Sequence, residues 1–305
     1  MGEPPAFRKH PEIDNVLVIG PNGNVGSALI PRLLALGYAV RALQFRTPVQ
    51  PRDGLEIVAG STLDPPSLVR AVDGVDALCH LIRNAPGETF CDSWFNTCLR
   101  GTVNLLEAAR GRPLKRFLNG SADNAFGHTT IRHLGPINEN SPKRFADGHY
   151  GLFKIAEEEI LRQYHVGFGV PTVVTRFPLI WTRPFPPCNA CCELDDERKV
   201  VRMRLDVDGR PQVRHDVHID DAVQGVLLAL EKDQAVGEDF TFAAPAPLCA
   251  EPMAEAIRDA MGYKIEPFQG DWHAWTVDDA KARSVLGYRP QVDLMAYFRN
   301  ALPQA

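Results

Sequence analysis

The sequence predicts an α/β protein built on an open, doubly wound parallel β-sheet, and three observations support this. Short apolar runs alternate with helix-length segments from residue 15 to residue 176. A glycine-rich turn separates the first apolar run from the first helix. After Arg176 the alternation stops and a segment rich in proline and charge follows. Strands that alternate with helices of about ten or more residues form parallel units, so we expect one sheet covered by helices and a smaller region beyond it.

The first strand and helix are the most clearly marked elements. Residues 15–20 (NVLVIG) are apolar and end in glycine, which predicts a short buried strand. Residues 23–37 (GNVGSALIPRLLALG) have helical periodicity. Gly37 stands where a helix commonly ends in left-handed backbone, so we expect the helix to end there.

The remaining elements follow the same alternation. Further strands are predicted at residues 38–45, 55–60, 75–81, 116–121 and 171–177, and helices at 64–74, 94–111, 149–161, 220–232 and 251–262. Residues 181–199 are expected to form a long loop or small lobe outside the sheet. We therefore predict a dinucleotide-binding domain over residues 11–176, to which residues 214–232 return, and a mainly substrate-binding lobe over residues 177–305.

Composition excludes several classes of protein. With 45% apolar and 23% charged residues, the chain of 305 residues is expected to be globular. Its net charge of -5 argues against nucleic-acid or membrane-surface partners, which usually require clustered basic residues. We find no signal-like apolar segment after the N-terminal charges and no run approaching about 18 apolar residues. These features predict a cytoplasmic protein.

Seven cysteines, an odd number, indicate reduced thiols better than a disulfide framework. Cys188, Cys191 and Cys192 form a tight cluster, but no second pair follows at the spacing of a zinc site. We therefore expect free or buried thiols there and predict no metal.

The glycine-rich turn predicts a binding site for a dinucleotide. Gly20, Gly23 and Gly26 follow the first strand and open the first helix. Glycines at these points allow a tight turn and bring backbone N–H groups close to a pyrophosphate. The residues between them, Asn22, Asn24 and Val25, are expected to line the same site.

Tyr150 and Lys154 are four residues apart on the predicted helix and so share one face of it. Two interpretations fit this spacing. Tyr150 with Phe153, Ala156 and Ile160 can be an ordinary core-facing stripe with Lys154 at its edge. Alternatively, the phenol and the ammonium form a catalytic pair. Spacing alone favours the first interpretation.

Several motifs occur together in one order: GPNGNVG, GVDALCHL, GTVNLLEAA, the tyrosine–lysine pair, VHIDDAV and GYRP. In this order, from about residue 16 to about residue 302, the chain resembles the extended short-chain dehydrogenase/reductase family, the NAD-dependent epimerase/dehydratase group. The resemblance implies a Rossmann sheet with a substrate lobe, and a homodimer formed through residues 94–110 and 150–164. It also implies that Tyr150 and Lys154 are catalytic, that Lys154 binds the nicotinamide ribose, and that Leu81 lies against the cofactor.

This resemblance suggests how the pair acts. A free phenol has a pKa near 10, too high for a base at neutral pH, and a neighbouring cation favours the phenolate. Lys154 should therefore lower the pKa of Tyr150 into the working range. Tyr150 would then take a proton from an alcohol while hydride leaves for the cofactor, or return it in the reverse reaction.

The chain departs from the family pattern where a serine or threonine hydroxyl normally contacts the substrate. Ala122 stands at that position. Ser121, Asp123 and Asn124 are the nearest polar residues, and we expect Asp123 and Ser121 to be catalytic and Asn124 to contact substrate. Asn124 also replaces the glutamate of the family's dehydratases, which disfavours dehydration.

Other candidates lie on the substrate side. Arg83 and Arg214 are predicted to hold an anionic group of the substrate, against the alternatives of a solvent-facing side chain and a surface salt bridge. Leu179 stands where sugar-nucleotide enzymes of the family carry an asparagine. His80 and His218 are expected to be structural, as is Asp221 near a helix start.

The end of the second strand bears on the choice of dinucleotide. It carries Gln44 and no nearby acid that would accept both hydroxyls of the adenosine ribose. Arg46 and Arg41 would place positive charge near a 2′-phosphate. The sequence therefore favours NADP over NAD.

Together these features predict an NAD(P)-dependent oxidoreductase or epimerase that acts on a hydroxyl or ketone of a sugar-like or polyoxygenated small molecule. Two alternatives stay open at this point. One is a nucleotide-sugar epimerase with tightly bound NAD, and the other is a non-catalytic dinucleotide-sensing or scaffold protein, suggested by Ala122.

Overall fold

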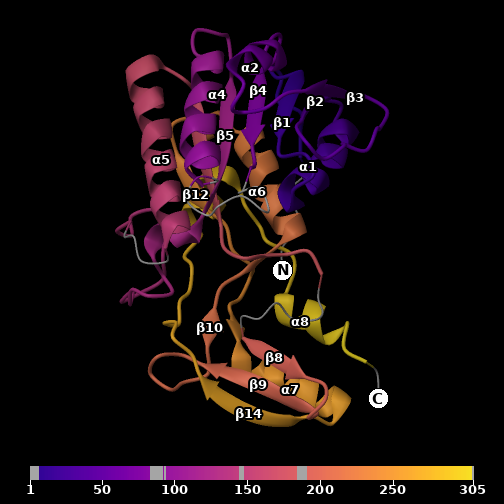
Figure 1. Cartoon of the computed structure of the whole chain (residues 1–305), viewed down its shortest axis with the longest axis vertical. Coiled ribbons are helices and arrows are strands. Elements are labelled where there is room, and N and C mark those ends of the chain that lie inside the picture. Colours follow the sequence, from indigo (N-terminus) through magenta and orange to yellow (C-terminus); the bar gives the residue numbers. More distant parts are fainter. Residues whose placement is uncertain (1–6, 83–91, 93, 144–147, 184–190, 304–305) are drawn as a thin grey trace.

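The computed structural model describes residues 7–82, 92, 94–143, 148–183 and 191–303. An α/β domain lies above a smaller lobe (Figure 1). The domain contains one seven-stranded sheet whose pairings are all parallel. The predicted doubly wound sheet is therefore confirmed. Its strands, in spatial order, are β12 (Asp239–Thr241), β6 (Thr172–Phe177), β5 (Arg116–Ala122), β4 (Ala77–His80), β1 (Asn15–Ile19), β2 (Ala39–Gln44) and β3 (Leu55–Ala59).

Alternation along β1 shows how the two faces of the sheet are covered. Val16 and Val18 pack into a core shared with α1 (Asn24–Ala35) and α6 (Ile219–Glu231). Leu17 and Ile19 point to the opposite face, into a core shared with three other helices. Because both faces are buried, β1 is apolar throughout, as parallel strands usually are. The three other helices are α2 (Pro65–Ala71), α4 (Gly101–Ala109) and α5 (His149–Phe168).

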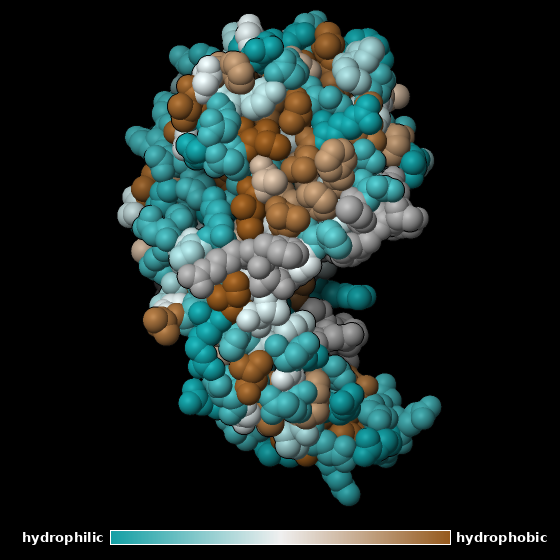
Figure 2. Space-filling view, turned by 60° about the vertical axis from the view of Figure 1, so that its left-hand side comes forward, coloured by the Kyte–Doolittle hydropathy of each residue, from teal (hydrophilic) through white to brown (hydrophobic). Residues whose placement is uncertain are grey.

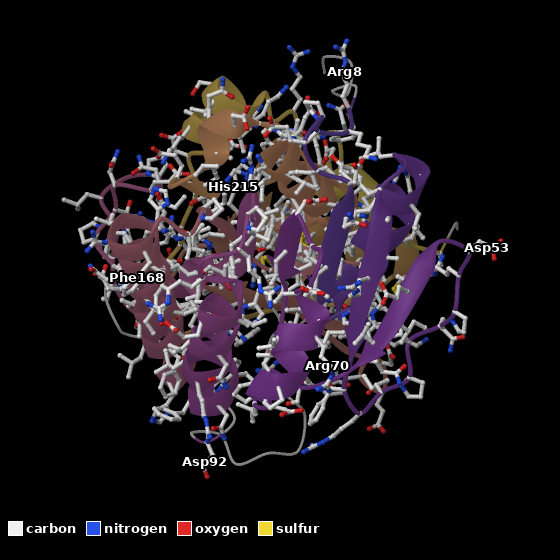
Figure 3. The ribbon with its side chains drawn as sticks, turned by 90° about the horizontal axis from the view of Figure 1, so that it is seen from above. Arg8, Asp53, Arg70, Asp92, Phe168 and His215 are labelled. Carbon is white, nitrogen blue, oxygen red and sulfur yellow. The ribbon has the colours of Figure 1, made fainter. Side chains whose placement is uncertain are left out.

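The view from above separates the ends of this layered domain (Figure 3). Phe168, at the end of α5, and Asp53, ahead of β3, lie at opposite sides of the molecule. Helix α4 is preceded by π-helical turns, η1 (Phe95–Arg100). At the end of α1, Gly37 has a φ of +83°, and the neighbouring Tyr38 N–H donates to the Leu33 carbonyl. The predicted glycine end of this helix is confirmed.

The lobe has a core of its own, which includes Trp181, Met253 and Phe298. Its three-stranded sheet joins β8 (Cys192–Asp195), β9 (Val200–Leu205) and β14 (Lys264–Gln269). The smaller pairs are β7 (Ile180–Trp181) with β11 (Val217–His218), and β10 (Val213–Arg214) with β13 (Leu248–Cys249). Two helices, α7 (Ala250–Met261) and α8 (Leu294–Arg299), and the short turns η2 (Asp123–Phe126), η3 (Asp233–Ala235) and η4 (Ala282–Leu286) complete the described elements.

Two features of the fold differ from the sequence expectations. Strand β12 extends the main sheet beside β6, although no strand was predicted there. Phe240 of β12 and Leu286 of η4 also join the core of the upper domain, so more of the C-terminal region returns to this domain than residues 214–232 alone. A strand of three residues carries too little periodicity to be recognised. The described part of residues 181–199 belongs to the smaller lobe, in agreement with one of the two expectations, and β8 forms a strand there.

The described cysteines are free thiols, and Cys191 and Cys192 are buried in the lobe. Burial raises the pKa of Cys192 to about 12, which makes its thiol unreactive at neutral pH. Cys188 lies outside the described residues. Within the described ranges, no group of three or more His, Cys, Asp or Glu side chains is arranged to hold a metal ion. No described helix combines the length and the apolar character that crossing a membrane requires.

Candidate active site

A cavity of about 1040 Å³ lies between the carboxyl ends of the parallel strands and the lobe. Figure 2 shows the surface hollowed between these two parts of the molecule. The strand order reverses between β1 and β4, and doubly wound sheets bind ligands at such a point. Most of the residues predicted from the sequence line this cavity: Gly20, Asn22, Gly23, Asn24, Val25, Leu81, Ser121, Asp123, Asn124, Tyr150, Lys154 and Arg214.

The glycine turn is packed so closely that its conformation requires glycine. Gly20 has a φ of +86°, and a Cβ on it would lie 2.8 Å from the Leu81 carbonyl oxygen. A Cβ on Gly26 would lie 2.2 Å from the Gly20 carbonyl oxygen. The Asn22 amide donates to the Thr47 carbonyl at 3.0 Å and so ties the turn to the loop after β2. With the N-terminus of α1 behind it, this turn has the form and the dipole that a pyrophosphate requires.

The predicted adenosine end contains fewer available cations than the sequence suggested. The Arg41 guanidinium donates to Glu56 at 2.7 Å and to the Ala71 carbonyl at 2.8 Å, so its donors are used within the fold. The Gln44 side chain accepts from the Val49 N–H at 2.8 Å. Arg46 is exposed, and its guanidinium carbon lies 4.8 Å from the centroid of the Phe45 ring. Arg41 is therefore engaged within the fold, whereas Arg46 lies at the surface after β2.

Tyr150 and Lys154 reach the cavity from the first two turns of α5. The Tyr150 ring lies 4.5 Å from the Trp94 ring, centroid to centroid, and belongs to a small apolar cluster with Phe153. Lys154 Nζ is 6.0 Å from the centroid of the Tyr150 ring. Tyr150 therefore packs against apolar neighbours, as the first interpretation expects, but Lys154 is buried and lines the cavity beside it. The catalytic role of the pair stays a prediction.

Close packing at Gly151 sets the position of this pair. A Cβ on Gly151 would lie 2.7 Å from the Asn124 carbonyl oxygen, so α5 approaches η2 as only glycine permits. This contact sets the first turn of α5, which carries Tyr150, against η2, which directly follows β5. The approach was not visible in the sequence, where Gly151 stands in an ordinary helical pattern.

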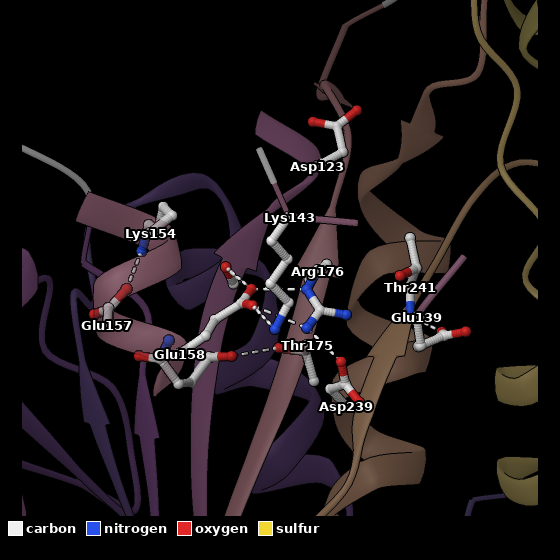
Figure 4. A network of polar contacts seen from close by, with 12 residues as sticks. Asp123, Glu139, Lys143, Lys154, Glu157, Glu158, Thr175, Arg176, Asp239 and Thr241 are labelled. Carbon is white, nitrogen blue, oxygen red and sulfur yellow. Dashed lines mark hydrogen bonds and ion pairs between the residues drawn. The ribbon is translucent and has the colours of Figure 1, made fainter. Parts of the chain in front are cut away.

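Lys154 is almost completely buried, with 1% of its surface exposed. Its ammonium donates to the Gly120 carbonyl at 2.9 Å. It also donates to Glu157 Oε2 at 2.7 Å (Figure 4). The Thr102 hydroxyl donates to Glu157 Oε1 at 2.8 Å. Burial on its own would lower the pKa of Lys154, but the adjacent Glu157 carboxylate outweighs it and raises this pKa above the usual lysine value. Lys154 is therefore a cation throughout the physiological range.

Ser121 belongs to a second buried network. Its hydroxyl donates to Glu158 Oε1 at 2.6 Å, so this oxygen turns toward α5. Glu158 also accepts two hydrogen bonds from Arg176, which in turn pairs with Asp239 (Figure 4). Ala122 lines the cavity at the position where the family carries its hydroxyl.

Asp123 lies apart from both networks, close to a histidine that sequence analysis did not identify. His128 Nδ1 donates to the Asp123 carbonyl at 3.0 Å, and His128 Nε2 lies 3.5 Å from Asp123 Oδ2. Both residues are buried, each with 4% of its surface exposed, and both line the cavity. They form the titratable pair nearest to Ala122 on that wall.

The lobe supplies an aromatic wall that was also missed. The Trp275 ring packs against the His128 ring at 4.3 Å between centroids, and the Arg214 guanidinium carbon lies 5.2 Å from its centroid. Trp272 meets Trp275 edge to face. The backbone brings these segments together, since Trp275 N–H donates to the Val213 carbonyl. No sequence signal could have revealed contacts between segments so far apart.

Arg214 lines the cavity but is already paired. Its Nε donates to Asp216 Oδ1 at 2.7 Å, and both residues are buried. Arg214 does form a salt bridge, but the alternative of a surface salt bridge is wrong, because the Arg214–Asp216 pair is buried in the cavity wall. Arg83 lies outside the residues that the structure describes, so its contact with substrate stays a prediction.

The residues expected to be structural take structural positions. His80 is buried and its Nδ1 lies 2.9 Å from Asn119 Oδ1. His218 caps α6, accepting from the Asp220 N–H at 3.2 Å. Asp221 accepts from the backbone N–H groups of residues 291 and 292 and so ties α6 to the C-terminal segment. These contacts agree with the structural roles expected for the three residues.

Comparisons with known proteins agree with this geometry. The sequence model of the NAD dependent epimerase/dehydratase family matches residues 16–243. A dTDP-glucose 4,6-dehydratase of Streptomyces griseus is 26% identical over 310 residues, covering 92% of this chain and 90% of that protein. A 4-hydroxy-2-methyl-3-oxo-4-farnesyl-3,4-dihydroquinoline-1-oxide ketoreductase of Stigmatella aurantiaca is 27% identical over 318 residues, covering 90% and 92%. A crystal structure of a short-chain dehydrogenase/reductase superfamily protein from Agrobacterium tumefaciens with bound NAD has a TM-score of 0.82 at 25% identity, covering 94% and 95%.

Proposed function

Because the chain belongs to the NAD-dependent epimerase/dehydratase family, we propose that it is an oxidoreductase or epimerase that interconverts a hydroxyl and a ketone on a sugar-like or other polyoxygenated small molecule. One observation carries the proposal. Tyr150 and Lys154 line the same cavity as the glycine turn, so a proton donor and a dinucleotide site face one space. A nicotinamide cofactor bound there supplies or accepts the hydride.

The chain's own residues hold the cofactor and the proton. The glycine turn at residues 20–26 offers backbone N–H groups to the diphosphate. An ammonium has three N–H donors, and Lys154 uses two of them on Gly120 and Glu157. The third is available to the nicotinamide ribose. Tyr150 gives its phenolic proton to the nascent alkoxide during reduction and takes it back during oxidation.

The hydroxyl that the family places at position 122 must have a substitute if the substrate oxygen is to be held. Asn124 and the Asp123–His128 pair are the polar groups on that wall, and we assign them this task. Ser121 lines the cavity, but we assign it an indirect role, because its hydroxyl donates to Glu158. We do not assign dehydration to this site, since the Asn124 amide cannot exchange a proton usefully.

Removing the phenolic oxygen tests the mechanism. Tyr150→Phe should lower turnover by about 10²- to 10⁴-fold while the fold and cofactor affinity persist. Tyr164→Phe is the matched control, because Tyr164 lies on the same helix but bonds Glu107 at the surface. Turnover is followed by nicotinamide absorbance with a panel of sugars, polyols and their ketones. Equal activity in both variants would rule out Tyr150 as the acid–base group.

The same assay separates the remaining alternatives. A nucleotide-sugar epimerase retains bound NAD through purification and causes no net change in nicotinamide absorbance. A dehydrogenase or reductase causes a net change. Leu179 and the two tryptophans of the lobe wall give the substrate side an apolar character, which favours a substrate with an apolar ring face. A non-catalytic sensor would bind the dinucleotide and turn over no member of the panel.

We propose NADP as the preferred cofactor. Two features support this: Arg46 is exposed just after β2, and residue 44, at the end of that strand, is a glutamine instead of an acid.

We also propose a homodimer through η1, α4 and α5. Phe95, Leu152, Val166 and Phe168 expose 42–71% of their surface on these elements. Figure 2 turns the side of α5 forward, and hydrophobic residues gather across it. Sedimentation at increasing concentration tests the dimer.

The cytoplasmic location rests on the buried, free thiols and stays a prediction.

A further inference from the structure

The charge of Lys154 is already balanced by a carboxylate inside the protein. Lys154 and Glu157 are one helical turn apart on α5 and meet at 2.7 Å, each with 2% or less of its side chain exposed. The Thr102 hydroxyl of α4 holds the second oxygen of Glu157, and the Gly120 carbonyl of β5 holds the ammonium. The pair is therefore fixed from three elements and cannot separate without breaking buried contacts.

The groups around this pair add little charge of their own. His80 of β4 lies 3.7 Å from Glu157 Oε1, and burial lowers its pKa, which keeps the imidazole neutral. Cys98 of η1 has a pKa raised to about 11 by burial, so its thiol is also neutral. The remaining charged or titratable groups of the cavity, Asp123, His128 and Arg214, line its other walls.

This arrangement changes what Lys154 can do to Tyr150. A lone cation beside a phenol favours the phenolate, but a cation paired with an anion acts as a dipole, whose field falls off faster with distance. Lys154 Nζ is 6.0 Å from the centroid of the Tyr150 ring, and Glu157 is in contact with that same nitrogen. The Glu157 carboxylate therefore offsets part of the stabilisation that Lys154 alone would give to a Tyr150 phenolate.

We propose that Glu157 is a positioning residue for the Tyr150–Lys154 pair, which holds the ammonium on the cavity floor and offsets its charge so that Tyr150 keeps its proton in the resting protein. The consequence depends on the proposed function. A protonated Tyr150 is ready to protonate an alkoxide, so carbonyl reduction runs throughout neutral pH. Alcohol oxidation needs the Tyr150 phenolate, so without a further cation its rate rises only at alkaline pH. The positive ring of the bound oxidised cofactor would be such a cation and would favour the phenolate at lower pH.

The test titrates Tyr150 in the protein without cofactor or substrate, so it does not depend on turnover. Tyrosinate absorbance is recorded against pH for the wild-type protein and Tyr150→Phe, and the difference isolates one phenol among six tyrosines. The same pair of titrations is made with Glu157→Gln. Removal of the carboxylate should lower the midpoint for Tyr150 by about one to two pH units, because Lys154 then acts as an uncompensated cation.

Glu159→Gln is the matched control. Glu159 is on the same helix and pairs with Arg162 at the surface, so the same charge is removed far from the cavity. It should move the Tyr150 midpoint by less than about 0.3 units, because surface charges are screened. Equal midpoints in the wild-type protein and Glu157→Gln would overturn the proposal.

A second measurement applies if Glu157→Gln does not fold. The wild-type midpoint itself should lie within about one unit of a free phenol, near 10. A midpoint further below that value would show that Lys154 activates Tyr150 despite Glu157, and the proposal would be wrong. If the Tyr150 midpoint shifts in Glu157→Gln but the protein turns over no substrate, the proposed function is wrong and the role of Glu157 still holds.

Discussion

Two neighbouring residues of α5, Glu157 and Glu158, build buried networks with different tasks. Glu157 bonds Lys154, whose ammonium lines the cavity. Glu158 bonds Arg176, which lies within the sheet and reaches Asp239 of β12. Both networks are buried and both contain a cation (Figure 4). The comparison teaches that a buried ion pair does not by itself mark a functional site, since only the pair that reaches the cavity can act on a ligand.

The geometry of a helix explains how adjacent residues can be so different. Successive side chains are about 100° apart, so Glu157 points toward α4 and η1 while Glu158 points toward the sheet. Burial alone would raise the pKa of Glu158, but Arg176 and Lys143 lower it below its usual value. Glu158 therefore ties α5 to β5, β6 and β12 as a carboxylate.

Breaking the second network should have the largest effect on stability. Arg176→Met leaves Glu158 and Asp239 without their shared cation, and the free energy of unfolding should fall by about 3–5 kcal/mol. Urea denaturation followed by circular dichroism measures this. Arg162→Met, on the exposed face of α5, should leave the denaturation midpoint unchanged. Equal losses in the two variants would mean that Arg176 is not a structural tie.

Breaking the first network should affect turnover most. Lys154→Met removes the donor that we assign to the ribose and the cation beside Tyr150, and should lower turnover by about 10²- to 10³-fold at saturating cofactor. Lys143→Met is the control, because Lys143 pairs with Glu158 in the other network. Comparable rates in Lys154→Met and Lys143→Met would remove the functional distinction between the networks.

The two networks should weaken at opposite ends of the pH scale. The folded-state pKa values of Glu158 and Asp239 are lowered, so their stabilisation is full above the unfolded values and is lost as pH falls through the folded ones. The free energy of unfolding should drop by about 1–3 kcal/mol as pH falls below about 4.5, and Glu158→Gln should flatten this slope. The pKa of Lys154 is raised, so its contribution is lost only at strongly alkaline pH. Urea titrations at several pH values test both limbs.

An exposed cation should have the smallest effect. Arg46→Ala should reduce the ratio of NADP to NAD affinity by about tenfold at low salt and by less at high salt, because Arg46 is open to solvent. Arg52→Ala, also exposed, is the control. Calorimetric titration with both dinucleotides gives the ratios. An unchanged ratio in Arg46→Ala would leave the preference for NADP without support.

The sequence by itself determined the class of fold, the glycine turn and the tyrosine–lysine pair, and through them the family. Each of these features lies within a few residues along the chain. A buried strand needs an apolar run, a tight turn needs glycine, and i and i+4 share a helix face wherever the helix packs. The packing of Gly20 against Leu81 then explains in space what the motif indicated.

Only the tertiary structure decided which partners these residues meet. Glu157 reaches Thr102, Ser121 reaches Glu158, and Arg41 is used by Glu56. The lobe wall joins His128 and Trp275, which lie far apart in the sequence. Such contacts depend on how helices and loops pack on the sheet, and no local periodicity encodes them. The sequence therefore located the proposed acid–base pair, and packing set the charge around it.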